Sequence, residues 1–319
     1  MNSAPHPGPR QAQGRFALGI DVGGTKIAGG IVDLATGAVT ARRQVPTDYA
    51  RGGAAILADT VALARDLQDE ARRLGLSVAA LGLGVAELVD RQGRVFSDHR
   101  IRWSGFDVAG ALGAVLPTTV SADVRAAALA EARFGAGRGV ADFYYVTVGT
   151  GVAGVLVLDG VPYAGSRGAA LVIANSMERR RCTVCGHESC WMVEDAASGP
   201  GVAAAYGAGT AEAVLAAARG GEARALQVID HATRELGRLL ALLADSLDPQ
   251  VMVIGGGLGC APGPYFDALA RHVRAGLWDG VPNPMILTQA EMGADAGLIG
   301  AALATTYQNE PAKRPQHTI

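Results

Sequence analysis

The sequence predicts an α/β protein with two related lobes and a cleft between them. Short apolar, β-rich runs alternate with helical patterns along the chain, which favours sheets covered by helices. A strand, a glycine-rich turn and a second strand occur twice, about 130 residues apart, and this recurrence indicates an internal repeat. At 319 residues the chain is long enough for two domains that each bury a core.

The first half of the chain alternates strand and helix patterns. The expected elements are strands at 16–20 and 27–34, a helix at 54–74, a buried strand at 78–85, a short strand at 117–122, and a helix that begins at 124 and is closed by Gly135 and Gly137. The 54–74 helix rests on apolar residues spaced three and four apart, and the strands rest on short apolar runs between turn residues.

The second half repeats the strand, glycine and strand pattern and then becomes mainly helical. The expected elements are strands at 143–148 and 152–158, a helix at 223–245, a buried strand at 251–254, and helices at 265–277 and 296–307.

These elements suggest a division of the chain. We expect a disordered tail over 1–15, an N-terminal α/β lobe over 16–121 completed by a C-terminal helix at 305–312, and a C-terminal α/β lobe over 122–304 that carries a cysteine cluster.

Charge and hydropathy exclude several classes of partner. The chain has 28 basic and 30 acidic side chains, so a clustered positive surface for nucleic acid is not expected. No apolar run reaches the roughly 18 residues that a membrane span needs. The first 15 residues contain no apolar stretch typical of a signal peptide, and we therefore expect a cytoplasmic protein.

Three glycine-rich turns predict a site for the phosphates of a nucleotide. They lie at 23–24, 149–151 and 255–257, and Thr25 and Thr150 add hydroxyl donors to the first two. Glycine lets backbone N–H groups approach an anion without a Cβ in the way. For any one turn an ordinary hairpin is the alternative. The P-loop pattern G-x-x-x-x-G-K-[ST] is absent.

Five segments in order resemble the ROK family of sugar kinases and sugar-responsive regulators. They are LGIDVGGTKIAGGIVD (18–33), ADVRAAALAEARFGAG (122–137), VTVGTGVAGVLVLDG (146–160), VIGGGLG (253–259) and GADAGLIGAALA (293–304). The resemblance covers roughly residues 16 to 305. It implies the two-lobed actin-like fold of ribonuclease-H-type lobes, ATP and Mg²⁺ as cofactors, and a sugar-like substrate; we also expect a homodimer.

The resemblance implies a role for each matching residue. Asp123 would be the catalytic aspartate that accepts the proton of the attacking hydroxyl, although it also fits an N-cap of the following helix, and both roles can hold together. Asp21 would hold Mg²⁺ through water. The residues placed around ATP are Asp21, Gly23, Gly24, Thr25 and Lys26 in the first loop, Gly149, Thr150 and Gly151 in the second, and Gly255, Gly256 and Gly257 at the nucleoside end.

The sequence departs from the family pattern on the sugar side. The family's asparagine before the catalytic aspartate is Ala122, and the glutamate and histidine of its E-x-G-H segment are Val172 and Asn175. His99 replaces the asparagine four residues before the substrate-loop tryptophan, and Glu87 replaces a glycine. A site that loses such polar partners rejects its former ligand strongly, so a substrate other than glucose is expected.

Several changed polar residues are candidate substrate contacts. Glu87 faces either an ammonium group of the substrate or solvent, and His99 and Asn175 are further candidates. Glu194 follows Cys190 by four residues, where the family's substrate-binding glutamate follows the last cysteine by two.

We therefore predict an ATP-dependent kinase for an exocyclic primary hydroxyl of a modified sugar, such as the amino sugar kanosamine, or of a C7-cyclitol. Only Lys26 and Lys313 are lysines, a usage typical of GC-rich genomes, and this favours secondary metabolism such as antibiotic biosynthesis. The alternatives are an ordinary glucokinase and a non-catalytic sugar-binding regulator. Regulators carry a helix-turn-helix module before the first loop, and about 15 residues precede Phe16 here.

A cysteine cluster suggests a structural zinc site. Its members are Cys182, Cys185 and Cys190. Closely spaced thiolates suit tetrahedral Zn²⁺. The family's zinc-binding histidine is replaced by Asn175, so His187 is the candidate fourth ligand, and loss of zinc is the alternative.

Overall fold

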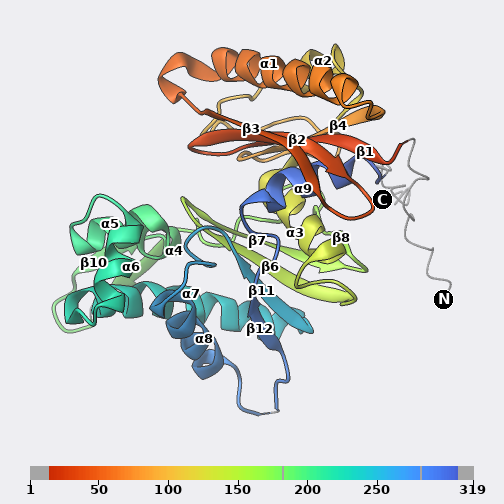
Figure 1. Cartoon of the computed structure of the whole chain (residues 1–319). Coiled ribbons are helices and arrows are strands. Elements are labelled where there is room, and N and C mark those ends of the chain that lie inside the picture. Colours follow the sequence, from red (N-terminus) through yellow and green to blue (C-terminus); the bar gives the residue numbers. More distant parts are fainter. Residues whose placement is uncertain (1–13, 182, 281, 308–319) are drawn as a thin grey trace, which may run out of the picture. The chain divides into compact units, whose positions relative to one another are not determined.

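The computed structural model describes residues 14–307 except 182 and 281, and it divides into two compact units (Figure 1). The first unit runs to Phe134 and includes Val161–Ala170 and the chain from Asp295 onward. The second unit comprises Gly135–Gly160 and Leu171–Ala294. Most of the expected N-terminal tail and of the helix expected at 305–312 lies outside the described residues.

A mixed five-stranded sheet forms the centre of the first unit. Its order is β3-β2-β1-β4-β5. The strands are β1 (Phe16–Val22), β2 (Lys26–Asp33), β3 (Val39–Pro46), β4 (Val78–Val85) and β5 (Thr118–Ala122). β1 pairs antiparallel with β2 and parallel with β4, and β4 pairs parallel with β5. The strands β1 and β2 are almost entirely buried, as expected for strands covered on both faces.

The second sheet repeats this arrangement. It consists of β6 (Asp142–Val148), β7 (Val152–Leu158), β8 (Val161–Pro162), β11 (Val251–Gly255) and β12 (Ile286–Gln289). The order is β12-β11-β6-β7-β8, with β6 antiparallel to β7 and parallel to β11. In both sheets the first strand pairs antiparallel with the second and parallel with the fourth, so the internal repeat predicted from the sequence is confirmed.

Helices cover both faces of the first sheet (Figure 1). They are η1 (Tyr49–Arg51), α1 (Gly52–Arg73), α2 (Val108–Gly113), α3 (Asp123–Phe134) and α9 (Ala296–Ala304). The α9 backbone lies directly on the sheet, because a Cβ added to Gly82 would be 1.7 Å from the Ala301 carbonyl oxygen. α9 also contacts α3 closely, since a Cβ on Gly300 would be 1.6 Å from the Ala126 oxygen.

The second unit has its own helical layer and a small hairpin. The helices are α4 (Val193–Ala197), α5 (Gly199–Tyr206), α6 (Ala211–Arg219), α7 (Ala223–Leu247) and α8 (Pro264–Gly276), and the hairpin pairs β9 (Glu178–Arg181) with β10 (Glu188–Trp191). The core contains Leu236, Leu240 and Leu269. The buried Tyr265 donates its hydroxyl to the Ala197 carbonyl at 2.7 Å, which joins α8 to α4.

The unit boundary differs from the predicted one. Residue 121 was the expected end of the N-terminal lobe, whereas the first unit continues through α3 to Phe134. The reason is the close packing of α3 on α9. The chain from Asp295 returns to the first unit, so α9 completes it, and the helix expected at 296–307 ends at Ala304.

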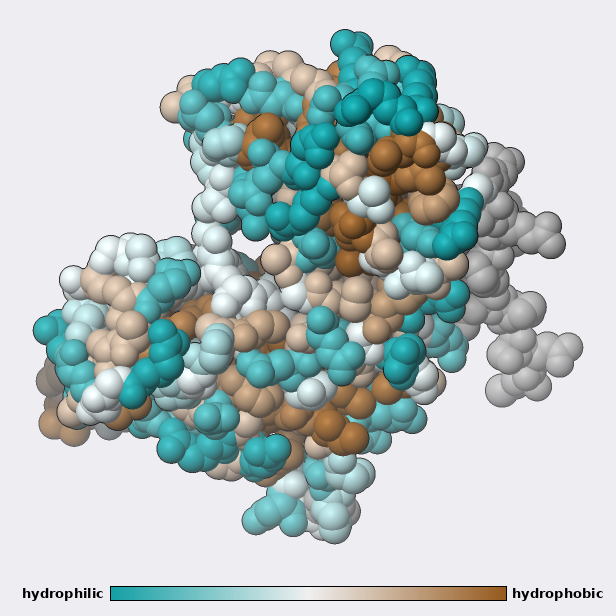
Figure 2. Space-filling view, in the orientation of Figure 1, coloured by the Kyte–Doolittle hydropathy of each residue, from teal (hydrophilic) through white to brown (hydrophobic). Residues whose placement is uncertain are grey.

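Among the described helices, none is by itself long and apolar enough to cross a membrane, although the bent pair α5 and α6 together has the length and composition of such a segment. Figure 2 shows hydrophilic and hydrophobic side chains interspersed on the visible face of each unit.

We predict that Gly82→Ala destabilises the protein by about 3 kcal/mol, because the new methyl group has to displace the α9 backbone. The control is Gly113→Ala at the end of α2, where an added Cβ meets nothing within 4 Å. Urea unfolding of both variants measures the difference. Equal stability of the two variants would show that α9 is not held this closely.

Candidate active site

Three acidic side chains lie at the carboxyl ends of neighbouring parallel strands in the first unit. Asp21 is near the end of β1, Glu87 follows β4, and Asp123 follows β5 directly. Since β1, β4 and β5 are adjacent and parallel, their carboxyl ends share one edge of the sheet. In open α/β sheets this edge is where ligands bind.

Asp21 is held against the start of α9. A Cβ on Gly297, in the first turn of that helix, would lie 2.5 Å from Asp21 Oδ2, so only glycine leaves room for the carboxylate. The positive end of the helix dipole favours an anion at this position. Burial is the main reason that the pKa of Asp21 rises to about 7; the charge of Asp123 raises it further and that of Lys26 lowers it.

The Asp21 carboxylate also fits a role in holding a divalent cation. Its Oδ1 atom is buried and has no hydrogen-bond partner. An oxygen of this kind suits Mg²⁺, which prefers carboxylate and water ligands. Within the described part of the chain no cluster of three or more His, Cys, Asp or Glu side chains could hold a metal. One carboxylate acting through water, with nucleotide phosphates, fits this site better than an all-protein cage.

Asp123 is the first residue of α3. Its Oδ1 accepts a hydrogen bond from the Val124 backbone N–H at 2.7 Å, so the carboxylate does interact with the first turn, in keeping with the helix-capping alternative. Burial raises the pKa of Asp123 to about 6, against lowering contributions from the Val124 N–H and Arg125. A carboxyl with this raised pKa is still mostly ionised at neutral pH and is therefore suited to receive a proton.

Arg125 connects three segments around Asp123, and the sequence analysis did not single it out. The buried guanidinium donates to the carbonyl oxygens of Gly168 at 2.9 Å and Val89 at 2.7 Å. Gly168 has a φ of +88°, and a Cβ there would be 2.2 Å from the Val89 oxygen. Burial lowers the pKa of Arg125 to about 10, so the side chain remains charged at neutral pH. The sequence did offer a signal for this role, because Arg125 is a charged residue among the small apolar residues at the start of the predicted helix.

Glu87 is buried and bonded to a loop, which corrects the expectation that it points to solvent. Only 5% of the residue is exposed. Its two oxygens accept hydrogen bonds from Ser97 Oγ and from the backbone N–H groups of His99, Arg100, Ile101 and Arg102. Burial opposes ionisation of Glu87, but these hydrogen bonds outweigh it and hold the pKa below its usual value. The carboxylate therefore has no acceptor left over for a substrate amine.

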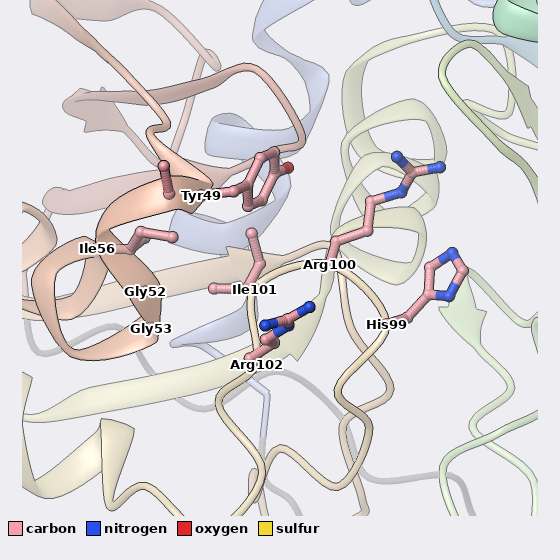
Figure 3. A pocket seen from close by; sticks show the side chains of 9 residues that line it. Tyr49, Gly52, Gly53, Ile56, His99, Arg100, Ile101 and Arg102 are labelled. Carbon is pink, nitrogen blue, oxygen red and sulfur yellow. The ribbon is translucent and has the colours of Figure 1, made fainter.

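The far side of this loop lines a cavity of about 390 Å³ at the start of α1 (Figure 3). Tyr49, Ile56 and Ile101 contribute to its wall, and the side chains of His99 and Arg100 extend from the loop on the side away from Ile56. Trp103 fixes the end of the loop by donating its indole N–H to the Gly53 carbonyl at 2.8 Å.

The first glycine loop is the turn between β1 and β2. The Gly23 N–H donates to the Lys26 carbonyl at 3.0 Å. Thr47 holds the turn from outside, because its hydroxyl donates to the Gly23 oxygen and its N–H to the Thr25 oxygen, both at 3.0 Å. Gly24 lies within this turn. The structure thus places the whole predicted loop beside Asp21.

The second and third glycine loops come together in the second unit. They follow β6 and β11, which are adjacent parallel strands. A Cβ on Gly149 would have only the Gly257 nitrogen, at 3.7 Å, as a neighbour, so the space before the loop is open. Gly256 has a φ of +82°, and a Cβ there would be 2.4 Å from the Val148 oxygen, which explains the need for glycine. Gly151 accepts the Gly149 N–H at 2.9 Å and closes the turn around Thr150.

Two predicted substrate residues form a pair in the second unit. The Asn175 amide donates to Glu194 Oε1 at 2.8 Å, and the Val152 N–H donates to Glu194 Oε2 at 2.7 Å. Glu194 is thereby oriented just beyond the second glycine loop.

The cysteine cluster is described only in part. Cys185 and Cys190 are exposed, Cys190 lying in β10 and Cys185 in the turn before it, and Cys182 lies outside the described residues. His187 is on the same exposed turn.

Acidic residues at a sheet edge and glycine loops after paired strands are the features of a phosphotransferase with two ribonuclease-H-type units. The ROK family profile matches residues 17–307, and the chain belongs to the ROK family. It is 30% identical to a glucokinase of Halalkalibacterium halodurans, over 95% of this chain and 99% of that protein. It is 32% identical to an N-acetylmannosamine kinase of Citrobacter koseri, over 90% of this chain and 97% of that protein.

Solved structures give the same result for the fold. A ROK family glucokinase from Streptomyces griseus, in complex with glucose and AMPPNP, matches with a TM-score of 0.77 and 28% identity, over 90% of this chain and 98% of that one. A ROK hexokinase from Thermus thermophilus matches with a TM-score of 0.72 and 31% identity, over 90% and 97%. The two-lobed actin-like fold implied by the sequence motifs is confirmed.

We predict that Asp21 makes the ligand-free protein less stable as the pH rises. Its folded-state pKa of about 7 lies above the usual aspartate value of about 4, so its stabilising contribution is complete below that usual value and is lost as the pH rises through 7. Relative to Asp21→Asn, the wild type should lose roughly 2–4 kcal/mol of unfolding free energy across this range. Urea unfolding from pH 4.5 to 8, without Mg²⁺ or nucleotide, measures it. A pH-independent difference between the two proteins would contradict the assignment.

Proposed function

We propose that the protein transfers the γ-phosphoryl group of ATP to an exocyclic primary hydroxyl of a modified sugar or a cyclitol. At the coarser level it is an ATP-dependent sugar kinase, as its family membership and kinase relatives indicate. The observation that carries the proposal is the pair Asp21 and Asp123 at the carboxyl ends of β1 and β5, on one edge of the sheet, both with raised pKa values.

Asp123 is the proposed proton acceptor. Phosphoryl transfer has a loose transition state, so the residue mainly has to orient the hydroxyl and take its proton as the bond to phosphorus forms. Its pKa of about 6 leaves most of the carboxyl ionised at neutral pH. The Val124 N–H fixes the Oδ1 atom of this carboxylate at 2.7 Å, which orients the group for the substrate hydroxyl.

The glycine loops are the proposed phosphate contacts, with Lys26 following the first. Backbone N–H groups at these turns can donate to phosphate oxygens because no Cβ intervenes. Mg²⁺, when bound through water to Asp21, neutralises part of the phosphate charge. Gly255 ends β11, Gly256 and Gly257 follow it, and these three residues are proposed to line the nucleoside end.

The substrate is proposed to differ from plain glucose. Ala122 is fully buried and Val172 is 47% exposed, and neither side chain can hydrogen-bond a sugar hydroxyl. Each hydroxyl left without a partner costs on the order of 1–3 kcal/mol. An amino sugar such as kanosamine, or a C7-cyclitol from secondary metabolism, fits a site with fewer hydroxyl contacts and other polar groups.

Glu194 is a better candidate than Glu87 for contacting an amine. Both described partners of Glu194 are neutral donors, Asn175 and the Val152 N–H, with one on each oxygen. A carboxylate oxygen can accept more than one hydrogen bond, so we propose that Glu194 also accepts one from the substrate. Glu87 is saturated by its loop. We propose Glu194, with Asn175 and His99, as the substrate-recognition residues.

An ordinary hexose kinase is the second candidate, because a sequence relative and a structurally similar protein are both named glucokinase. An N-acetylmannosamine kinase among the relatives shows that the family also includes kinases for sugars with a nitrogen substituent. We further propose that the enzyme is a homodimer, which light scattering can measure.

We predict that Asp123→Asn lowers kcat by several powers of ten, on the order of 10³-fold or more, and leaves ATP affinity nearly unchanged. The amide keeps the shape of the side chain but cannot accept a proton. Coupled ADP release and nucleotide titration measure the two quantities. Wild-type turnover in this variant would remove Asp123 from the mechanism.

The substrate prediction is tested by ADP release across glucose, mannose, N-acetyl sugars, amino sugars and cyclitols. We expect kcat/KM for glucose to lie below that for the best modified substrate by a few orders of magnitude, because two or three lost contacts act together. Glu194→Gln should harm the reaction of an amine-bearing substrate more than the residual glucose reaction. Glucose matching or exceeding every other compound would restore the glucokinase alternative.

We also propose that about one Zn²⁺ per chain is bound by Cys182, Cys185 and Cys190. Two of these thiols are described and lie on one hairpin, Cys185 in its turn and Cys190 in β10. Elemental analysis of protein purified without chelator should find zinc, and Cys190→Ser should lose it. Absence of zinc together with freely titratable thiols would reject the site.

A further inference from the structure

The loop after β4 is built around an internal carboxylate. Four consecutive residues, His99 to Arg102, direct their backbone N–H groups at Glu87, and the two shortest of these bonds come from Arg100 at 2.5 Å and Ile101 at 2.6 Å. Converging backbone N–H groups form a nest, the arrangement that proteins use to bind external anions. Here the anion belongs to the chain itself.

The nest imposes an unusual conformation on the loop. Arg102 has a φ of +61°, in the left-handed region that non-glycine residues rarely adopt. Such a conformation persists only where surrounding contacts hold it. Glu87 holds the loop from one side, and the Trp103 indole bond to Gly53 holds its end.

The loop of residues 97–102 lies between the sheet edge that carries Asp123 and the cavity at the start of α1. Glu87 follows β4 and Asp123 follows the adjacent parallel strand β5, and because Val85 pairs with Ala122 the two residues leave the sheet side by side. On the other side, His99 and Arg100 extend from the same loop beside the cavity (Figure 3). A change at Glu87 therefore alters where these side chains stand relative to Asp123.

We propose that Glu87 is a positioning residue: its carboxylate fills the backbone nest of residues 99–102 and thereby sets the position of His99 and the affinity for the sugar substrate. The inference rests on the proposed function for the role of His99. The hydrogen-bonded nest itself does not depend on that function.

Chemical rescue tests the proposal. Glu87→Ala empties the nest, and we expect KM for the best substrate of the panel to rise about tenfold or more while KM for ATP changes little. Formate, a carboxylate small enough for the vacated space, should restore most of the loss. Glu87→Gln should show a similar defect without rescue, because its amide fills the space and presents N–H donors to N–H donors.

Two further variants provide controls. Asp98→Asn changes an exposed carboxylate of the same loop, which accepts the Ser104 N–H at 2.9 Å and is not bonded to Glu87, and it should behave as wild type. Glu87→Asp keeps the charge on a shorter side chain and should show an intermediate defect. It serves in place of Glu87→Ala if the alanine variant does not fold, with formate then expected to give little rescue.

Hydrogen exchange of peptides covering 97–103 gives a readout that needs no substrate. The amides of this segment should exchange faster in Glu87→Ala and regain protection with formate, whereas Asp98→Asn should match wild type. Unchanged exchange and unchanged sugar KM in the Glu87 variants would overturn the proposal. Rescued exchange without any effect on sugar KM would reject the substrate role. If no compound of the panel is phosphorylated, the proposed function fails. The hydrogen exchange of residues 97–103 then still shows whether Glu87 holds the backbone nest.

Discussion

The close contact of α9 with the first sheet is the constraint on which the proposed active site depends. Gly19 and Gly82 bring the helix backbone onto β1 and β4, since a Cβ at either position would lie within 2.0 Å of an α9 carbonyl oxygen. The first turn of α9 then presses Gly297 against the Asp21 carboxylate. α3 packs on the same helix through Gly300, and α3 begins with Asp123. One helix seated on glycines thus positions both carboxylates.

This packing has an electrostatic cost that is matched to the chemistry. Asp21 and Asp123 are desolvated and lie near each other, so each resists ionisation. Lys26 and Arg125 offset part of this cost. A divalent cation and a substrate hydroxyl would stabilise the ionised forms further. Ionisation of these two carboxyl groups is therefore unfavourable in the ligand-free site, and binding of the cation and the substrate would make it more favourable.

Local patterns predicted much of this arrangement. The strands around Gly23 and Gly149 follow from apolar runs interrupted by glycine, and the repeated sheet order follows from their recurrence. β3 was not predicted because Arg42 and Arg43 interrupt its pattern, although it alternates half-buried and exposed residues as an edge strand does. The small helices α4 to α6 also lacked a clear period.

The tertiary partners of the site residues were not predictable from spacing. Glu87 looks like an exposed or substrate-facing carboxylate in the sequence, because its five donors lie ten to fifteen residues further along the chain. Arg125 reads as a helix residue until Val89 and Gly168 are seen to meet it. The observed domain boundary differs from the predicted one for the same reason, because the contact of α3 with α9 joins segments that are far apart in sequence.

Proton release on nucleotide binding tests most directly the claim that Asp21 is a buried, cation-ready carboxylate. Titration calorimetry of preformed Mg–ATP at pH 7, in buffers of different ionisation enthalpy, measures the number of protons released. Because the pKa of Asp21 is about 7 in the ligand-free protein, the wild type should release a fraction of a proton that Asp21→Asn does not. Equal proton release by the two proteins, with Mg–ATP bound to both, would contradict the account.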